Sequence, residues 1–227
     1  MYDKLAPHYR KYSLEKARYL DAVDKIIIGQ TLNKADSMLD VGSGDGIRAI
    51  KLAKEMNINN LVLSEPSPVM VELCKNIFTG EVWAVTAENL PTTNSKFDVI
   101  TCLWNVIGHI PNTNNRLMAL KRMHDLLKSG GVVFIDVNNR YNARSYGWGE
   151  IMKRVVYDLI FPKNNKGDTI YKLKIDEQTI TGMGHLFTPR EINNLIKNAG
   201  FRIKKCYVLD YRTGVEHSSF FFWSIII

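Results

Sequence analysis

Apolar runs of strand length alternate with amphipathic stretches of helix length along most of this chain. Continuous apolar runs predict five strands, at Ser37–Val41, Asn60–Ser64, Val82–Thr86, Phe97–Cys102 and Val132–Val137. Regular alternation of strands and helices is typical of a parallel sheet with crossover helices. The pattern therefore predicts an α/β fold in which helices cover both faces of a mostly parallel sheet.

Helix start and stop residues frame the segments between these strands. Ser67 and Pro68 have the residue types of an N-cap and a first helical position, and Thr188-Pro189-Arg190-Glu191 is a capping box. The expected helices are residues 14–31, 46–56, 68–78, 114–128 and 189–199, the fourth of them ending at Gly130. Two further strands are expected at Phe201–Leu209 and Ser219–Ile227, and the least regular region is 138–187.

Composition and charge argue against a membrane protein, a metal protein and a nucleic-acid-binding protein. No apolar run approaches the ~18 residues of a membrane span, and the run Phe220–Trp223 has the length of a buried core strand rather than of a membrane contact. Cys74, Cys102 and Cys206 lie far apart in apolar contexts, which predicts reduced thiols, no metal site and a cytoplasmic location. The net charge of +7 is scattered without a block of like charges, so neither nucleic acid nor a membrane is an expected partner.

A glycine-rich turn follows the first strand. The segment Met38-Leu39-Asp40-Val41-Gly42-Ser43-Gly44-Asp45-Gly46 leads from an apolar strand into a helix, and its glycines allow a ligand to approach the backbone closely. Ile47 occupies the position where the dinucleotide fingerprint G-x-G-x-x-G needs its third glycine, so the turn argues against NAD or FAD. The alternative is a tight strand-to-helix turn without a ligand.

At these residues the chain resembles the Rossmann-like, S-adenosylmethionine (SAM)-dependent methyltransferases, whose first motif commonly reads acidic-x-Gly-x-Gly-x-Gly. The resemblance implies a seven-stranded sheet with an antiparallel last strand, SAM as cofactor and S-adenosylhomocysteine as product. Glu65 ends the second strand, where an acidic residue can accept hydrogen bonds from both ribose hydroxyls. The implied cofactor residues are Asp40, Gly42, Gly44, Glu65, Pro66, Leu103 and the adenine-binding segment Thr86, Ala87 and Glu88, in which Thr86 replaces the family's usual aspartate.

The segment after the fourth strand bears on the methyl acceptor. The tetrapeptide Asn/Asp-Pro-Pro-aromatic of DNA methyltransferases that act on base amino groups does not follow this strand. Cys102-Leu103-x-Asn105 with His109-x-Pro111 resembles glycine and sarcosine N-methyltransferases, and Ile107-Gly108-His109 resembles aminosugar N,N-dimethyltransferases. The resemblance implies that Arg18 grips the SAM carboxylate, although an exposed helical charge is an equal interpretation.

Other residues of the resembled enzymes suggest how the acceptor is bound. His109 is the expected general base or substrate orienter, with a structural histidine as the alternative, and Tyr2 joins it in the expected catalytic set. Asn105, Asn138 and Tyr141 are the expected substrate residues. Asn138 stands where those enzymes hold the carboxylate of an amino acid with an arginine, so an amine without a carboxylate is expected.

We therefore expect one methyltransferase domain over residues 1–227, with an N-terminal helical cap at 1–35 and an insertion at 138–187 that forms a lid or acceptor pocket. The expected function is SAM-dependent methylation of a small molecule, with an amine nitrogen as acceptor. A hydroxyl acceptor, an RNA or protein substrate, and SAM binding without turnover are the alternatives. Homo-oligomerisation stays open.

Overall fold

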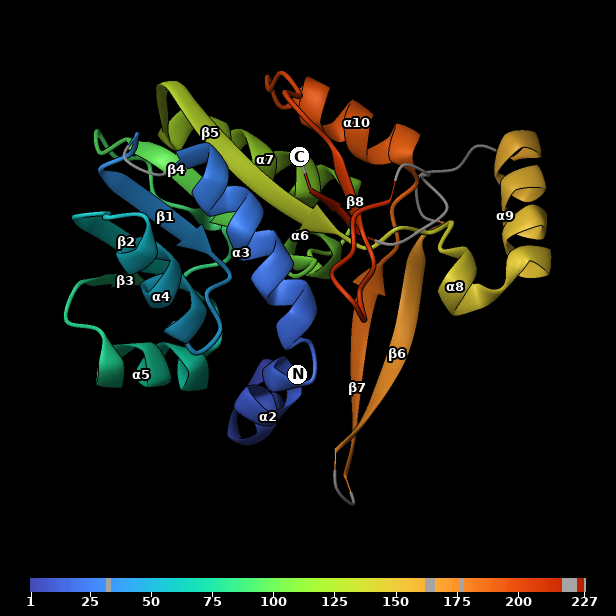
Figure 1. Cartoon of the computed structure of the whole chain (residues 1–227), viewed down its shortest axis with the longest axis horizontal. Helices are drawn as coiled ribbons and strands as arrows, with labels where there is room; N and C mark the ends of the chain where they lie inside the picture. The colour runs from blue at the N-terminus through green and yellow to red at the C-terminus, as the bar shows by residue number, and fades with distance from the viewer. Residues whose placement is uncertain (32–33, 162–165, 176–177, 218–223, 227) are drawn as a thin grey trace.

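A seven-stranded sheet forms the centre of the molecule in the computed structural model, which describes residues 1–31, 34–161, 166–175, 178–217 and 224–226 (Figure 1). Its strand order is β3-β2-β1-β4-β5-β9-β8. The strands β1 to β5 run parallel, and β9 is antiparallel to both of its neighbours. The strands of this sheet are β1 (Ser37–Val41), β2 (Asn60–Ser64), β3 (Glu81–Trp83), β4 (Phe97–Cys102), β5 (Leu127–Val137), β8 (Tyr207–Leu209) and β9 (Ser224–Ile226).

The sheet is buried on both faces because successive side chains of a strand point to opposite sides. In β1, Leu39 and Val41 join one hydrophobic core, and Met38 joins the other. The first core includes side chains of α7 (Thr113–Leu126) and α10 (Pro189–Asn198), and the second includes those of α3 (Ala17–Thr31) and α4 (Ile47–Glu55). Helices therefore cover both faces, as the sequence pattern predicts.

The remaining helices are short or lie outside these two layers. They are α1 (Tyr2–Leu5), η1 (Ala6–His8), α2 (Tyr9–Leu14), α5 (Pro68–Ile77), η2 (Ala87–Asn89), α6 (Val106–His109), α8 (Ala143–Tyr146) and α9 (Trp148–Ile160). Within the described part of the chain, no helix combines the length and the apolarity needed to cross a membrane.

Several predicted elements differ from the observed ones. The expected helix 14–31 is broken, because α2 ends at Leu14 and α3 begins at Ala17. Gly130 does not end a helix but lies within β5, where the β4–β5 register shifts. The third strand ends at Trp83 rather than Thr86, β8 takes up only Tyr207–Leu209 of the expected Phe201–Leu209, and of Ser219–Ile227 the described part is β9, with Phe220–Trp223 outside the described residues.

The region 138–187, expected to be the least regular, contains two helices and a separate two-stranded sheet. Its strands β6 (Asp168–Ile175) and β7 (Gln178–His185) pair in antiparallel register and project from the body as a long hairpin (Figure 1). Buried Arg116 of α7 donates to the Asp168 carboxylate at the base of this hairpin, with Nη2 and Oδ1 2.9 Å apart. Buried His185 contacts Asp168 and Glu191, the latter on α10. These contacts attach the hairpin to both helices.

The capping box of α10 generates a stability prediction. Thr188 Oγ1 accepts a hydrogen bond from the Glu191 backbone N–H at 3.1 Å. Replacing Thr188→Ala should lower the free energy of unfolding in urea by about 1 kcal/mol, because the N–H loses its partner. Thr188→Ser keeps the hydroxyl and should stay close to wild type. Equal losses in the two variants would show that the cap does not stabilise the helix.

Candidate cofactor and acceptor site

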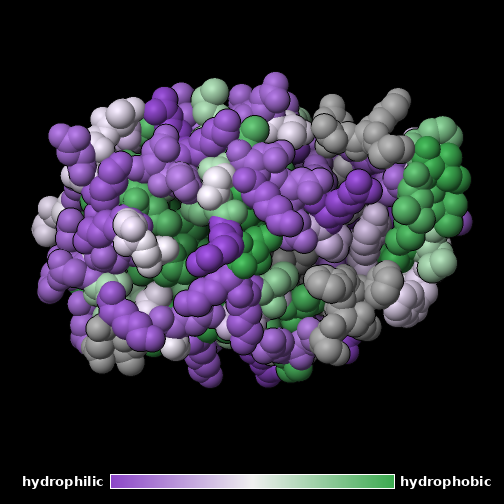
Figure 2. Space-filling model, turned by 90° about the horizontal axis from the view of Figure 1, so that it is seen from above, coloured by the Kyte–Doolittle hydropathy of each residue, from purple (hydrophilic) through white to green (hydrophobic). Residues whose placement is uncertain are grey.

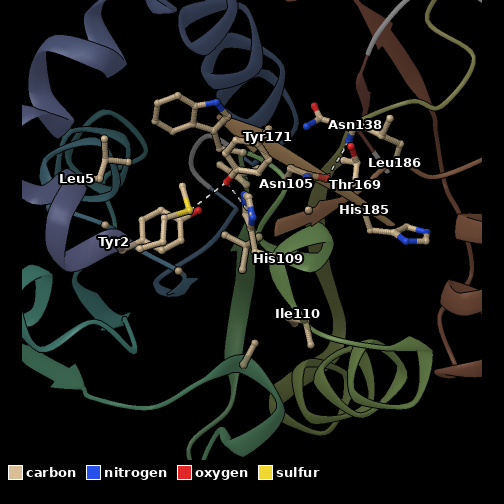
Figure 3. A pocket seen from close by; sticks show the side chains of 18 of the residues that line it. Tyr2, Leu5, Asn105, His109, Ile110, Asn138, Thr169, Tyr171, His185 and Leu186 are labelled. Atoms are coloured by element: carbon tan, nitrogen blue, oxygen red, sulfur yellow. Dashed lines mark hydrogen bonds between the residues drawn. The ribbon is translucent and has the colours of Figure 1, made fainter. Parts of the chain in front are cut away.

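The carboxyl ends of the parallel strands border a cavity of about 670 Å³. Val41, Glu65, Val85, Leu103 and Asn138, which end or follow β1 to β5 in turn, all line it. In open α/β sheets, ligands bind in the crevice beyond these strand ends. The N-terminal segment, α6 and the β6–β7 hairpin complete the wall (Figure 3).

The glycine turn forms one end of this cavity. Gly42 and Gly44 have φ angles of +77° and +57°, in the left-handed region that favours glycine. A Cβ at Gly42 would lie 2.4 Å from Val106 Cγ2, and one at Gly44 would lie 2.5 Å from Tyr9 Oη. Glycine at both positions therefore lets the Val106 and Tyr9 side chains, which line the cavity, pack directly against the turn.

Glu65 lies beside the turn as a buried carboxyl group. Its Oε2 accepts from the Gly44 N–H at 2.9 Å, and its Oε1 accepts from the Ser67 N–H at 3.0 Å. Burial raises the pKa of Glu65 to about 7, despite these two hydrogen bonds. Each carboxylate oxygen can accept a second hydrogen bond, so the group fits the hydroxyls of a ribose.

The other expected cofactor residues divide between the cavity and its support. Pro66, Thr86, Ala87, Glu88 and Leu103 line the cavity. Asp40 does not; it lies beneath the turn, where its Oδ1 accepts from Thr101 Oγ1 at 2.5 Å. Burial raises the Asp40 pKa. Asp40 therefore supports the turn from below.

A strained turn after β4 presents the next functional side chains. Trp104 and Asn105 both have left-handed backbone angles, with φ of +59° and +61°. Buried Asp136 of β5 holds the turn, because its Oδ2 accepts from the Trp104 N–H at 3.0 Å and its backbone carbonyl accepts from the Asn105 N–H at 3.1 Å. Asn105 Oδ1 in turn accepts from the Asn138 N–H at 3.0 Å. Strained backbone of this kind is concentrated at functional sites.

His109 at the end of α6 lies in the middle of the cavity wall (Figure 3). Its Nδ1 is 2.9 Å from the Met183 carbonyl oxygen, which can only accept, so Nδ1 carries the proton and Nε2 keeps a free lone pair in the neutral ring. Burial lowers the His109 pKa. The rings of Tyr2 and Tyr171 lie edge-on to the imidazole, with centroids 5.7 and 5.9 Å away.

Beyond His109, the cavity wall contains several uncharged polar side chains. Asn138, Asn139, Asn142 and Ser145 contribute amides and a hydroxyl, and no lysine or arginine occurs among the described lining residues. Alternate residues of β6, namely Thr169, Tyr171 and Leu173, also line this part. The intervening Ile170, Lys172 and Lys174 are exposed on the other face of the hairpin.

Besides Asp40, two expected site residues do not lie in the cavity wall. Arg18 is exposed on the side of α3 opposite the buried Tyr19 and Val23, so the structure does not bring it to the cofactor turn. Tyr141 donates through its hydroxyl to Asp158 Oδ2 at 3.1 Å and is thereby directed toward α9. Arg18 thus faces solvent, and Tyr141 faces α9 rather than the cavity.

The residues that hold His109 and the turn before it carry only weak signals in the sequence. Met183 acts through its backbone carbonyl, which no side-chain pattern could indicate. Tyr171 could have been identified by alternation along β6, since residues 169, 171 and 173 share one face of the strand. Asp136 acts through a hydrogen bond to Trp104, which forms only when β4 and β5 lie side by side.

Comparisons with known proteins identify the family of this chain. A family model described as a methyltransferase domain matches residues 8–205. An uncharacterized protein of Methanocaldococcus jannaschii is 30% identical over 222 residues, which cover 96% of this chain and 79% of that protein.

Solved structures share the fold. A SAM-dependent methyltransferase from Clostridium acetobutylicum superposes with a TM-score of 0.68 at 18% identity, over 99% of this chain and 96% of that one. The SAM-bound structure of an amino pentose methyltransferase from Micromonospora echinaspora gives 0.62 at 17% identity, over 96% and 94%. With the family match over most of its length, this chain belongs to the methyltransferase-domain family and is a SAM-dependent methyltransferase.

Proposed function

We propose that this methyltransferase transfers the methyl group to the nitrogen of a small amine that carries neither carboxylate nor phosphate. The observation that carries the proposal is the neutral His109 in a cavity whose described lining contains no lysine or arginine. Beyond His109, where the acceptor would lie, a buried carboxylate or phosphate would need a cationic partner, and the described lining there contains no lysine or arginine. The similarity in fold to an amino pentose methyltransferase supports an amine on a polar, uncharged molecule.

The residues at the glycine turn bind and orient the cofactor. When bound, SAM supplies a methyl group on a positively charged sulfur, which makes the methyl reactive without a metal. Glu65 would accept from the ribose hydroxyls, and the segment from Thr86 to Glu88 would hold the adenine. Gly42 and Gly44 keep the turn in its left-handed conformation at the end of the cavity where the cofactor would lie. Methyl transfer then requires mainly that the acceptor lone pair be held in line behind the methyl group and that water be excluded.

His109 removes the proton that an ammonium acceptor carries. An ammonium has no free lone pair, so its proton must leave before or during the attack on the methyl group. The Nε2 lone pair of His109 can accept it, since the Met183 carbonyl fixes the other nitrogen as the donor. Tyr2 orients the imidazole rather than acting as a base, because burial raises the Tyr2 pKa well above its ordinary value.

The chain functions in this proposal as one methyltransferase domain. Residues 1–35 act as the cover, since Tyr2, Leu5, Tyr9 and Tyr12 line the cavity beside the glycine turn. Residues 138–187 form the acceptor wall. Aromatic rings on the cover favour a cationic amine through the negative faces of their π-systems. Amide groups on the opposite wall suit the hydroxyls of a sugar-like molecule.

Glu65 should make cofactor binding dependent on pH. Ribose hydroxyls donate best to an ionised carboxylate, and the pKa of Glu65 is raised to about 7, so the affinity for S-adenosylhomocysteine should rise between pH 6 and 8. Glu65→Gln should weaken binding at pH 8 about 10- to 100-fold, which corresponds to a hydrogen bond to a charged group, and should remove the rise. Isothermal titration calorimetry measures both effects. The control variant is Glu72→Gln, at an exposed position on α5, and NAD is the ligand that should not bind. An unchanged pH dependence in Glu65→Gln would contradict the assignment.

His109→Ala should lower kcat about 100-fold or more while leaving the affinity for S-adenosylhomocysteine unchanged. The wild-type rate should fall only below the ordinary histidine pKa of 6.5, because burial lowers the His109 pKa and protonation then removes the lone pair. His124→Ala on the outer part of α7 is the matched control, since His124 does not line the cavity. Equal activity of the two variants would remove His109 from the mechanism.

The acceptor class can be tested by methyl transfer from labelled SAM to matched molecules. Aminosugars should be methylated, whereas sugars with a hydroxyl in place of the amine and amino acids with a carboxylate should react at least tenfold more slowly. Preference for the hydroxyl compounds would instead assign O-methylation. Preference for carboxylated amines would contradict the role of the uncharged wall.

A further inference from the structure

The helix α9 exposes its apolar face to solvent instead of packing it against the rest of the chain. Trp148, Met152, Val156, Leu159 and Ile160 recur at the spacing of one helix face, and all are at least half exposed. Phe161, which follows the helix, is also exposed. These six residues, here called the α9 face, form an apolar surface at one end of the molecule (Figure 2).

The opposite side of α9 attaches the helix to the body. Ile151 is fully buried there. Asp158 accepts from Arg140 Nε at 2.8 Å and pairs with Lys166 at 3.4 Å. Arg154 pairs with Glu150 and donates to the Arg140 carbonyl. Glu150, Arg154 and Asp158 thus lie on the attached side of the helix, whereas Lys153 is exposed, and the α9 face is directed toward solvent.

The area of the α9 face is larger than a monomer usually exposes. Leu159 is 75% exposed and Ile160 is 61% exposed. Since large apolar and aromatic residues have about 150–250 Å² each, the six together expose roughly 700 Å². The largest apolar patch of a typical monomer is about 300–600 Å². One partner of a standard protein interface contributes about 800 Å².

We propose that the α9 face is the contact surface of a homodimer, in which α9 of one chain packs on α9 of a second copy around a two-fold axis. A two-fold contact places the same patch on both partners, so the patch must be compatible with itself. The six residues carry no charge, and two copies can therefore meet without bringing like charges together despite the net charge of +7. Tryptophan, phenylalanine and methionine are also typical of interface cores.

A membrane surface fits the helix less well. Helices that lie on anionic bilayers have lysines and arginines directed at the lipid headgroups. Arg154 of α9 is instead engaged with Glu150 and the Arg140 carbonyl on the attached side, which leaves Lys153 as the single exposed cation of this helix. The attraction that would bring such a surface to a bilayer is therefore weak, whereas burial against a second α9 needs no charge.

The proposed dimer contact would also affect the part of the cavity that binds the acceptor. Tyr146 of α8 lines the cavity, and the Arg154 guanidinium of α9 lies over its ring at 4.1 Å. A dimer that holds α9 in place would also hold Tyr146, while the glycine turn lies at the other end of the cavity. We therefore expect monomeric variants to lose acceptor affinity and to keep cofactor affinity.

Light scattering after size exclusion, combined with calorimetry, tests the proposal on the full chain. At tens of micromolar, wild type should have twice the mass of one chain. Met152→Glu and Leu159→Glu should each have the mass of one chain and bind S-adenosylhomocysteine as wild type does, which shows that they are folded. The matched control is Met118→Glu, because Met118 is similarly exposed on a helix, α7, away from this surface, and it should stay dimeric.

Three outcomes would overturn the proposal. Monomeric wild type is the first, and flotation with vesicles of neutral and of anionic lipid would then test the membrane alternative. A dimer that persists in both α9 variants is the second, since another surface would then form it. The third is dissociation by Met118→Glu to the same extent, because added charge anywhere would explain the result. Hydrogen exchange gives an independent measure: protection of α9, but not of α7, should increase with protein concentration.

Discussion

Two hydrogen bonds to Asp136 fix the turn on which the functional site depends. The Trp104 and Asn105 conformations each cost about 1–3 kcal/mol in backbone strain, and the bond from the Trp104 N–H to the buried carboxylate offsets about 1.5–3 kcal/mol. Because β5 supplies Asp136 while β4 leads into the turn, the turn can form only when these two strands are paired. The start of α6, the direction of Asn105 and the place of His109 all follow from this turn.

Local sequence signals were sufficient for the elements whose burial is continuous or whose ends are capped. The limits of β1, β2 and β4 agree with the apolar runs, and α5 begins where Ser67 accepts from the Met70 N–H. The hairpin 168–185 escaped prediction because its stability comes from contacts distant in sequence, namely the buried Arg116 and His185. An isolated two-stranded hairpin is at best marginally stable, so its alternation alone is a weak signal.

The residues of the site also divide into those that local sequence could place and those that depend on contacts distant in sequence. The glycine turn and Glu65 were predictable because a strand end fixes their direction toward the crevice. Arg18 and Tyr141 were not, since a side chain on a helix or loop can turn to solvent or to a nearer partner such as Asp158. The tautomer of His109 depends on a carbonyl from β7, which only the folded chain brings into reach.

Successive side chains of β6 point alternately to the cavity and to solvent, so substitutions along this strand have two different effects. Substitutions at 169, 171 and 173 alter the cavity wall, and substitutions at 170, 172 and 174 alter only the outer face of the hairpin. Lys172 and Lys174 on that face also discourage another chain from adding a strand to the exposed edge. Three neighbouring positions can therefore change the shape and polarity of the cavity wall while the residues that discourage strand addition stay constant.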